Sequence, residues 1–307
     1  MCGLSKNDME ELKIWARSVL SLLFRRECLI CHRELRGFEK NLCTHCVADL
    51  PLSYTWCSDK SEADLSFYGR AYVEKVTSLL IYRGKFKELL YQLKYKGNVS
   101  IGIMLGEMLG SRLFLLEGQA TGNKQGSAKT ATSSLQTAGG KEQRSYLVVP
   151  VPLHWRKRIK RGYNQSAVLA KGVIKSLRER GIEARLCEGL LKRRRFTETQ
   201  TVKDRLSRWQ NVQKAFAFNP IRLRRLLKTT ARLSKNSTLN PSKTNSGQAE
   251  HTAETARQSA GNQQLEPLHF LLIDDVLTTG ATLDACANLL LKNCRCTVTI
   301  ATAAFVP

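Results

Sequence analysis

The stretch FLLIDDVLTTGATLDACANLL, residues 270–290, joins an apolar run to two acidic residues, a polar turn and an amphipathic segment. Its first four residues show no polar alternation, which is typical of a central strand buried on both faces of a parallel sheet. We expect Asp274 and Asp275 to emerge where this strand ends. After the turn, apolar residues at helical spacing predict a helix that begins near Thr279, with an inward stripe of Leu283, Ala287, Leu290 and Leu291.

The paired aspartates and the turn after them indicate a phosphorylated sugar. Two adjacent carboxylates repel each other, so we expect a cationic partner or one rich in hydroxyl groups, such as the vicinal diol of a ribose. A metal-binding or phosphoacceptor aspartate pair is an open alternative for these two residues alone. The turn offers hydroxyls and backbone N–H groups at a helix N-terminus, where a phosphate binds; its residues are Thr278, Thr279, Gly280, Ala281 and Thr282. The stretch therefore predicts a ribose 5-phosphate site.

Strand and helix patterns alternate along the rest of the chain. Apolar, β-rich runs at 78–82, 146–152, 183–187, 270–274 and 297–303 predict strands. Helical periodicity at 85–95, 101–116 and 164–180 predicts helices between them. This alternation is typical of an α/β fold with a parallel sheet flanked by helices, in which ligands bind beyond the carboxyl ends of the strands.

The whole of residues 270–282 resembles the phosphoribosyl pyrophosphate (PRPP) motif of type I phosphoribosyltransferases: four apolar residues, two acidic residues and a T-T-G-x-T loop. Three further segments resemble the ComF/GntX family of competence-type proteins: YRGKFKELLYQLKYKG (82–97), VPVPLHWRKRIKRGYNQ (149–165) and TQTVKDRLSRWQNVQKAF (199–216). The resemblance runs from about Cys28 to the C-terminus. It implies a type I phosphoribosyltransferase-like, Rossmann-like domain, which we place at residues 70–307.

The resemblance also implies roles for particular residues. Asp274 and Asp275 would hold the ribose diol, residues 278–282 the 5-phosphate, and Mg²⁺ would accompany PRPP. The loop with Pro152 and Leu153 would approach the pyrophosphate. Arg161 would line or cover the site, as would its neighbours Gly162, Asn164 and Gln165, while Gln200, Arg208 and Asn211 match the family pattern further on. The acceptor of a phosphoribosyl group is not specified, so catalysis itself stays open.

Cysteines near the N-terminus predict a structural zinc site. Two C-x-x-C pairs, Cys28/Cys31 and Cys43/Cys46, can supply the four soft ligands that zinc takes in a closed tetrahedral site. A redox role for one pair is the alternative, and His32 and His45 could substitute as ligands. ComF-like proteins carry a zinc ribbon at this place, and we assign it to residues 27–57. The thiol-rich composition without a disulfide framework favours a cytoplasmic location.

The net charge of +23 is concentrated in residues 141–228, which hold 24 Lys and Arg against 6 Asp and Glu. Such a field attracts polyanions, although it could equally be a solvated basic surface. It supports a second hypothesis, that the chain is a non-catalytic PRPP- or nucleotide-binding module acting on single-stranded DNA, since the ComF name comes from DNA uptake. We find no sequence motif for entering a DNA groove.

The remaining segments are the N-terminus and two low-complexity stretches. Residues 1–26 contain an apolar stripe at helical spacing but are too short and too charged to span a bilayer, so we expect a docking helix and no membrane insertion. Residues 118–145 and 229–265 are rich in Ser, Thr, Gly, Asn and Gln. Because they cannot bury enough apolar surface to offset chain ordering, we expect flexible insertions within one domain.

Overall fold

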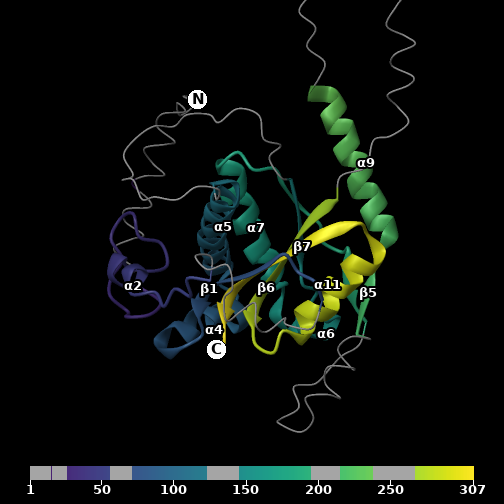
Figure 1. Ribbon diagram of the computed structural model, residues 1–307. Coiled ribbons are helices and arrows are strands. Elements are labelled where there is room, and N and C mark those ends of the chain that lie inside the picture. Colours follow the sequence, from purple (N-terminus) through teal and green to yellow (C-terminus); the bar gives the residue numbers. More distant parts are fainter. Residues whose placement is uncertain (1–14, 16–25, 56–70, 123–144, 195–214, 238–266) are drawn as a thin grey trace, which may run out of the picture.

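The computed structural model describes residue 15 and residues 26–55, 71–122, 145–194, 215–237 and 267–307 (Figure 1). Most of the expected docking helix and most of the two expected insertions lie outside these residues, as do Gln200, Arg208 and Asn211. The first insertion nevertheless begins inside a helix, because the helix before it runs to Gly122. Likewise, the helix before the second insertion runs to Ser237.

The α/β prediction is confirmed by a sheet of five parallel strands in the order β1-β7-β6-β2-β3. The strands are β1 (Lys75–Ile81), β2 (Tyr146–Pro150), β3 (Ala184–Leu186), β6 (Leu268–Leu277) and β7 (Cys296–Phe305). The predicted central strand, β6, pairs with β2 on one side and β7 on the other. Its apolar start is fully buried, because helices cover both faces of the sheet.

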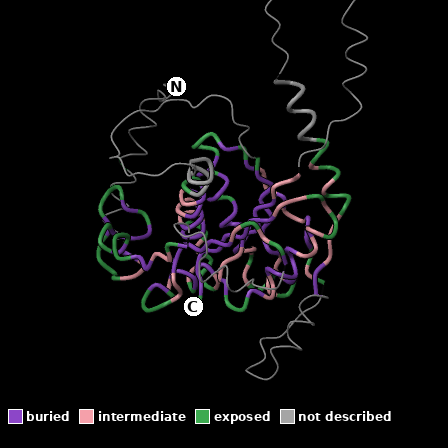
Figure 2. The backbone as a smooth tube through the Cα atoms, viewed as in Figure 1, coloured by how far each residue is buried: buried purple, intermediate pink, exposed green. Residues whose placement is uncertain are grey.

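Alternate strand residues enter two separate hydrophobic cores. On β2, Val148 packs with α4 (Lys87–Tyr95), α5 (Val99–Gly122) and α7 (Gln165–Glu179). Leu147 and Val149 face the other core, which contains α11 (Ala281–Asn293). That core also includes the small antiparallel sheet of β4 (Leu191–Arg193) and β5 (Phe216–Phe218), which the sequence analysis did not predict. In Figure 2 the buried segments gather in the interior of the molecule, and the exposed segments lie toward its outside.

Three shorter or outlying elements complete the described fold. The 3-10 turn η1 (Gly84–Phe86) leads into α4, and α6 (Trp155–Arg161) follows β2. The basic helix α9 (Pro220–Ser237) projects from the body of the molecule in Figure 1. None of the helices within the described ranges is long and apolar enough to cross a membrane.

Strand β6 continues through the two aspartates, which corrects the expectation that they follow its end. Its pairing with β2 stops at Ile273, opposite Pro150, whereas its pairing with β7 continues to Leu277. The Val151 N–H still donates to the Ile273 carbonyl, and beyond it the chain leaves β6 for the loop before α6. Asp274 and Asp275 therefore lie beyond the end of one neighbouring strand while the other still supports their backbone.

The cysteine module, residues 26–55, packs against the outer strand β1 and the helices beside it. The Ser53 N–H donates to the Leu79 carbonyl, and the Ile81 N–H donates to the Pro51 carbonyl. Asn41 donates to the Ser100 hydroxyl at the start of α5 over 2.9 Å. The module and the α4/α5 side of the sheet thus share one hydrophobic core.

Helices α5 and α7 touch through small residues. Gly102, Gly106 and Gly110 follow one another at four-residue spacing on α5 and face α7. A Cβ added at Gly106 would lie 2.2 Å from the Leu169 carbonyl oxygen and 2.9 Å from the Gly172 Cα. Backbone atoms cannot yield as a flexible side chain can, so this spacing sets how closely α7 approaches the sheet.

We predict that Gly106→Ala lowers the free energy of unfolding by about 1–3 kcal/mol, as overpacking does. The loss should appear even though alanine favours an isolated helix by about 1 kcal/mol over glycine. Urea denaturation measures the change. Ser111→Ala on the same helix is the control, because its hydroxyl donates to the Glu107 carbonyl within α5. An equal loss in both variants would contradict the close contact at Gly106.

Candidate functional sites

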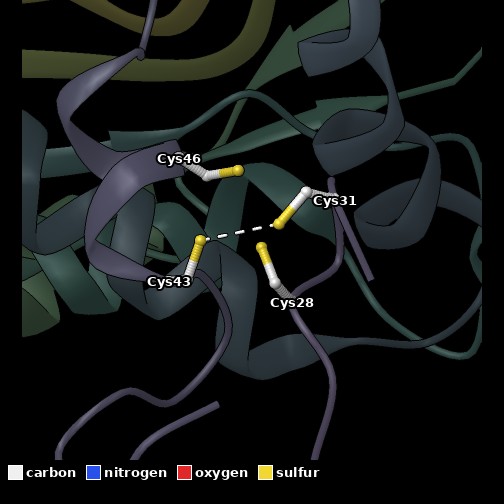
Figure 3. A group of neighbouring side chains, drawn as sticks. All are labelled: Cys28, Cys31, Cys43 and Cys46. Atoms are coloured by element: carbon white, nitrogen blue, oxygen red, sulfur yellow. Dashed lines mark hydrogen bonds between the residues drawn. The ribbon is translucent and has the colours of Figure 1, made fainter. Parts of the chain in front are cut away.

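The four predicted cysteines converge on one point (Figure 3). Their sulfur atoms all lie within 4.8 Å of one another, and the Sγ atoms of Cys31 and Cys43 are 3.6 Å apart. Cys43 and Cys46 flank the start of α2 (Thr44–Ala48), and the other pair lies in a tight turn closed by the His32 N–H and the Cys28 carbonyl. His32 and His45 are exposed. The geometry fits a metal such as zinc held by four thiolates.

The environment of the cluster favours thiolates unevenly. Burial raises the pKa of Cys28, but backbone hydrogen bonds at Cys31, Cys43 and Ile30 outweigh it and bring the pKa to about 6. Burial raises the pKa of Cys46, and its cysteine neighbours raise it further. A divalent cation would remove this conflict, because it stabilises all four sulfurs as anions.

Glu39 binds the N-terminus of α2, the helix next to the second cysteine pair. Its carboxylate accepts the Thr44 N–H at 2.6 Å and the Thr44 hydroxyl at 2.7 Å, at the N-terminus of α2. The Arg36 N–H donates to its other oxygen at 2.7 Å. These bonds, led by the Thr44 hydroxyl, lower the Glu39 pKa to about 2, so the loop between the cysteine pairs is tied to the helix that carries Cys46.

We predict that the purified chain binds about one zinc ion, and that Cys46→Ser loses it and the cooperative unfolding of the module. Elemental analysis and thermal unfolding with and without a chelator check both effects. Cys296→Ser is the control, since Cys296 lies on β7 outside the cluster. Full zinc content in Cys46→Ser would show that the four sulfurs do not form the site.

The second candidate site lies at the carboxyl edge of the parallel sheet, around Asp274. One carboxylate oxygen of Asp274 accepts the Ser166 hydroxyl at 2.9 Å and the Asp275 N–H at 2.9 Å. Burial raises the Asp274 pKa to about 7, and the negative charge of Asp275 adds to the rise. The Asp274 carboxylate thus accepts hydrogen bonds within the protein, and its bond to Ser166 joins β6 to the first turn of α7.

Asp275 points to a different neighbour, Lys94 in the last turn of α4. The Lys94 ammonium lies 3.2 Å from the Asp275 carboxylate, and the two side chains are only 22% and 15% exposed. This ion pair is more buried than the Lys85–Asp49 pair at the cysteine module, where both side chains are about half exposed. The adjacent aspartates therefore differ: one is held by neutral donors and the other by a cation.

The polar turn and helix predicted after the aspartates are present. Gly280 precedes α11 with a φ of +72°, a left-handed conformation that glycine adopts without strain. Thr278 and Thr279 are exposed, Ala281 and Thr282 are half-buried, and the first turn of α11 has amide groups with no acceptor inside the helix. The turn can therefore bind an anion through backbone N–H groups at the N-terminus of α11.

The loop after β2 approaches the same edge. The Val151 N–H donates to the Ile273 carbonyl at 2.9 Å, and the Asn164 side chain donates to the Val151 carbonyl at 3.0 Å. Pro152 and Leu153, which follow Val151 in the chain, are half-buried. The predicted loop is therefore fixed next to Ile273 of β6, immediately before the aspartates.

Arg161 and Gln165 lie between this loop and α4. The Arg161 guanidinium donates to the side-chain oxygen Oε1 of Gln165 at 3.2 Å and stacks over the Tyr95 ring at 5.2 Å. Gln165 is 1% exposed, and its side-chain nitrogen has no hydrogen-bond partner among the residues that the structure describes. A buried donor of this kind favours a ligand oxygen nearby.

Two further cations complete the electrostatics. Burial lowers the pKa of Lys157, and the positive charges of Arg193, Arg161 and Lys94 lower it further, while Asp275 opposes them. Burial also lowers the pKa of Arg193, against the attraction of Cys286 and Asp274. Positive charge from α4, α6 and β4 thus gathers around the aspartates.

Arg161 was predicted from the sequence, whereas Lys94, Lys157, Ser166 and Arg193 were not. Lys94 follows the buried Leu90 by four residues, so helical spacing places it at the edge of the inward stripe of α4. Nothing comparable marks Ser166 or Arg193, which depend on how α7 and β4 meet the sheet.

The sequence was compared with models of known protein families and with curated proteins, and neither comparison gave a match. The function proposed below therefore rests on the architecture and on the two candidate sites.

Proposed function

We propose that this chain is a ComF/GntX-type protein with a type I phosphoribosyltransferase fold and an N-terminal zinc ribbon. In this proposal it binds PRPP with Mg²⁺ and transfers the phosphoribosyl group to an acceptor nucleophile. The observation that carries the proposal is the succession of Asp274, Asp275 and the Gly280-led start of α11 at the carboxyl edge of a parallel sheet. Ligands bind at this edge in parallel α/β sheets.

Each part of the ligand has a suitable partner at that edge. The carboxylate of Asp275 can accept ribose hydroxyls, and Asp274 holds the strand and α7 together beneath it. Residues 278–282 can receive the 5-phosphate. The loop with Pro152 and Leu153, together with Arg161 and Lys157, offers the pyrophosphate a fixed backbone and positive charge.

The proposed reaction is a displacement at the anomeric carbon. The bond from this carbon to the pyrophosphate oxygen breaks, and the electron pair leaves with the pyrophosphate. A lone pair of the acceptor forms the new bond. Because the transition state is oxocarbenium-like, the protein contributes mainly by positioning the ribose and stabilising the leaving anion. Mg²⁺ would supply further positive charge to the pyrophosphate and ribose oxygens.

Calorimetry with PRPP and Mg²⁺ tests the proposal. We predict that Asp275→Asn weakens PRPP binding by roughly tenfold or more, because a carboxylate acceptor for the diol is lost. Asp49→Asn is the matched control, since it removes an aspartate from the exposed Lys85 pair on the cysteine module. Equal affinity in wild type and Asp275→Asn would exclude the ribose site at this position. In a separate assay on the wild type, release of pyrophosphate from PRPP when a nucleobase or an amine is added would identify the acceptor.

A second candidate function, binding of single-stranded DNA, is favoured by exposed aromatic residues among the cations. Tyr91 and Tyr95 on α4 have their ring centres 5.1 Å apart, and Trp155 on α6 is 58% exposed. Arg156 stacks over the Trp155 ring at 5.3 Å. Rings beside a basic surface are suited to stack bases without reading their sequence.

For this second function we predict binding of a single-stranded oligonucleotide that weakens steeply as salt is raised, because phosphate contacts release counterions. Trp155→Ala should weaken binding by roughly 1–3 kcal/mol, the value of one base stack. Fluorescence anisotropy over a salt series measures both, with Phe38→Ala, an exposed aromatic of the cysteine module, as control. Affinity that is independent of salt would contradict this function.

A further inference from the structure

Lys94 brings a positive charge from α4 into the candidate ribose site. Its ammonium lies 3.2 Å from the Asp275 carboxylate, and most of both side chains is shielded from solvent. Helix α4 lies outside the segment that decides the site, since β6, the polar turn and α11 span 268–293. A distant part of the chain therefore completes the surroundings of Asp275.

The residues on either side of Lys94 hold its backbone in place. The Tyr163 hydroxyl donates to the Leu93 carbonyl, and the Leu93 side chain is fully buried. The Tyr95 ring lies under the Arg161 guanidinium at 5.2 Å. Since both neighbours are attached to the segment that leads into α7, the last turn of α4 is anchored at the site.

The charges around Asp275 explain why a cation is needed there. On its own strand, Asp274 repels it at close range. From the elements packed around it, Lys94 on α4 and Lys157 on α6 attract it. Arg193 on β4 faces Asp274 instead. Lys94 is thus the direct counter-charge of Asp275, while burial and Asp275 keep the pKa of Asp274 raised.

We propose that Lys94 is a positioning residue of the ribose subsite, whose ammonium holds the Asp275 carboxylate oriented to accept the ribose hydroxyls. This inference rests on the proposed function, and it adds a residue from α4 to the site. The ammonium group meets one carboxylate oxygen, which leaves the carboxylate able to serve a diol as well.

The experiment compares wild type with Lys94→Met, Lys94→Gln and Lys94→Arg. Lys85→Met is the matched control, because it removes the cation of the exposed pair with Asp49. In the ligand-free protein, carbon NMR of the aspartate carboxyls follows the titration of the Asp274 and Asp275 pair, with Asp275→Asn to assign the signals. Calorimetry then measures the affinity for ribose 5-phosphate, 2-deoxyribose 5-phosphate and inorganic phosphate between pH 5.5 and 8.5.

We expect removal of the charge to raise the titration midpoint of the pair by about one pH unit, because a nearby cation favours the carboxylate. Binding of ribose 5-phosphate needs that carboxylate. As the pH falls, the variant should therefore lose its affinity at a higher pH than wild type does. At pH 7 the affinity should fall by roughly tenfold, and the preference over 2-deoxyribose 5-phosphate should shrink. Inorganic phosphate should bind equally, Lys85→Met should behave as wild type, and Lys94→Arg should recover most of the affinity.

Several results would overturn the role of Lys94. An unchanged titration in a folded Lys94→Gln or Lys94→Met protein would show that Lys94 does not control the pair. Tighter ribose 5-phosphate binding would make it a blocking residue, and equal losses for all three ligands would make it a general anion attractor. If the titration shifts but wild type binds neither ribose 5-phosphate nor PRPP, the proposed function itself is wrong.

Discussion

Two neighbouring carboxylates on one buried strand are the constraint to which the rest of this site responds. Charges of like sign at this distance cannot both ionise in a protein interior unless each has its own compensation. The fold supplies two kinds of compensation: hydroxyl and amide donors for Asp274, and the ammonium of Lys94 for Asp275. Strand β2 makes room for both by ending at Pro150, while β7 continues to support the backbone of β6. The acidic pair therefore lies beyond the last pairing with β2, while β7 still pairs with the same part of β6.

The elements that carry the compensating groups are held by packing rather than by further polar contacts. Ser166 lies in the first turn of α7, and α7 is set against α5 at the distance that the glycines of α5 allow. Lys94 belongs to α4, whose inward side shares a core with α5, β1 and the cysteine module. The four-cysteine cluster and the proposed ribose site thus rest on the same hydrophobic core, although their chemistry is separate. The cysteine module holds the outer strand in place. The helices beside that strand supply the groups that contact the acidic pair.

The segments with clear periodicity could be predicted from the sequence, because their interactions are local. Leu89, Leu90 and Leu93 marked the inward side of α4, and Val168 and Leu169 marked that of α7. The β4–β5 pair could not be foreseen, since its short strands lie on either side of a long intervening segment. The end of β6 was also misplaced. An acidic pair is typical of a strand end, but the ladder to β7 overrides that preference and carries the strand on to Leu277.

The sequence by itself determined the α/β class, the four cysteines of the metal site, and the order of acidic pair, polar turn and helix. These depend on residue type and on spacing along a short stretch of chain. The tertiary structure alone decided that the two aspartates are unequal, and which residues compensate each of them. Ser166 precedes Asp274 by 108 residues, and Lys94 lies in another helix still nearer the N-terminus. No local pattern encodes such contacts, because they exist only after the sheet has brought α4, α7 and β6 together and excluded water from between them.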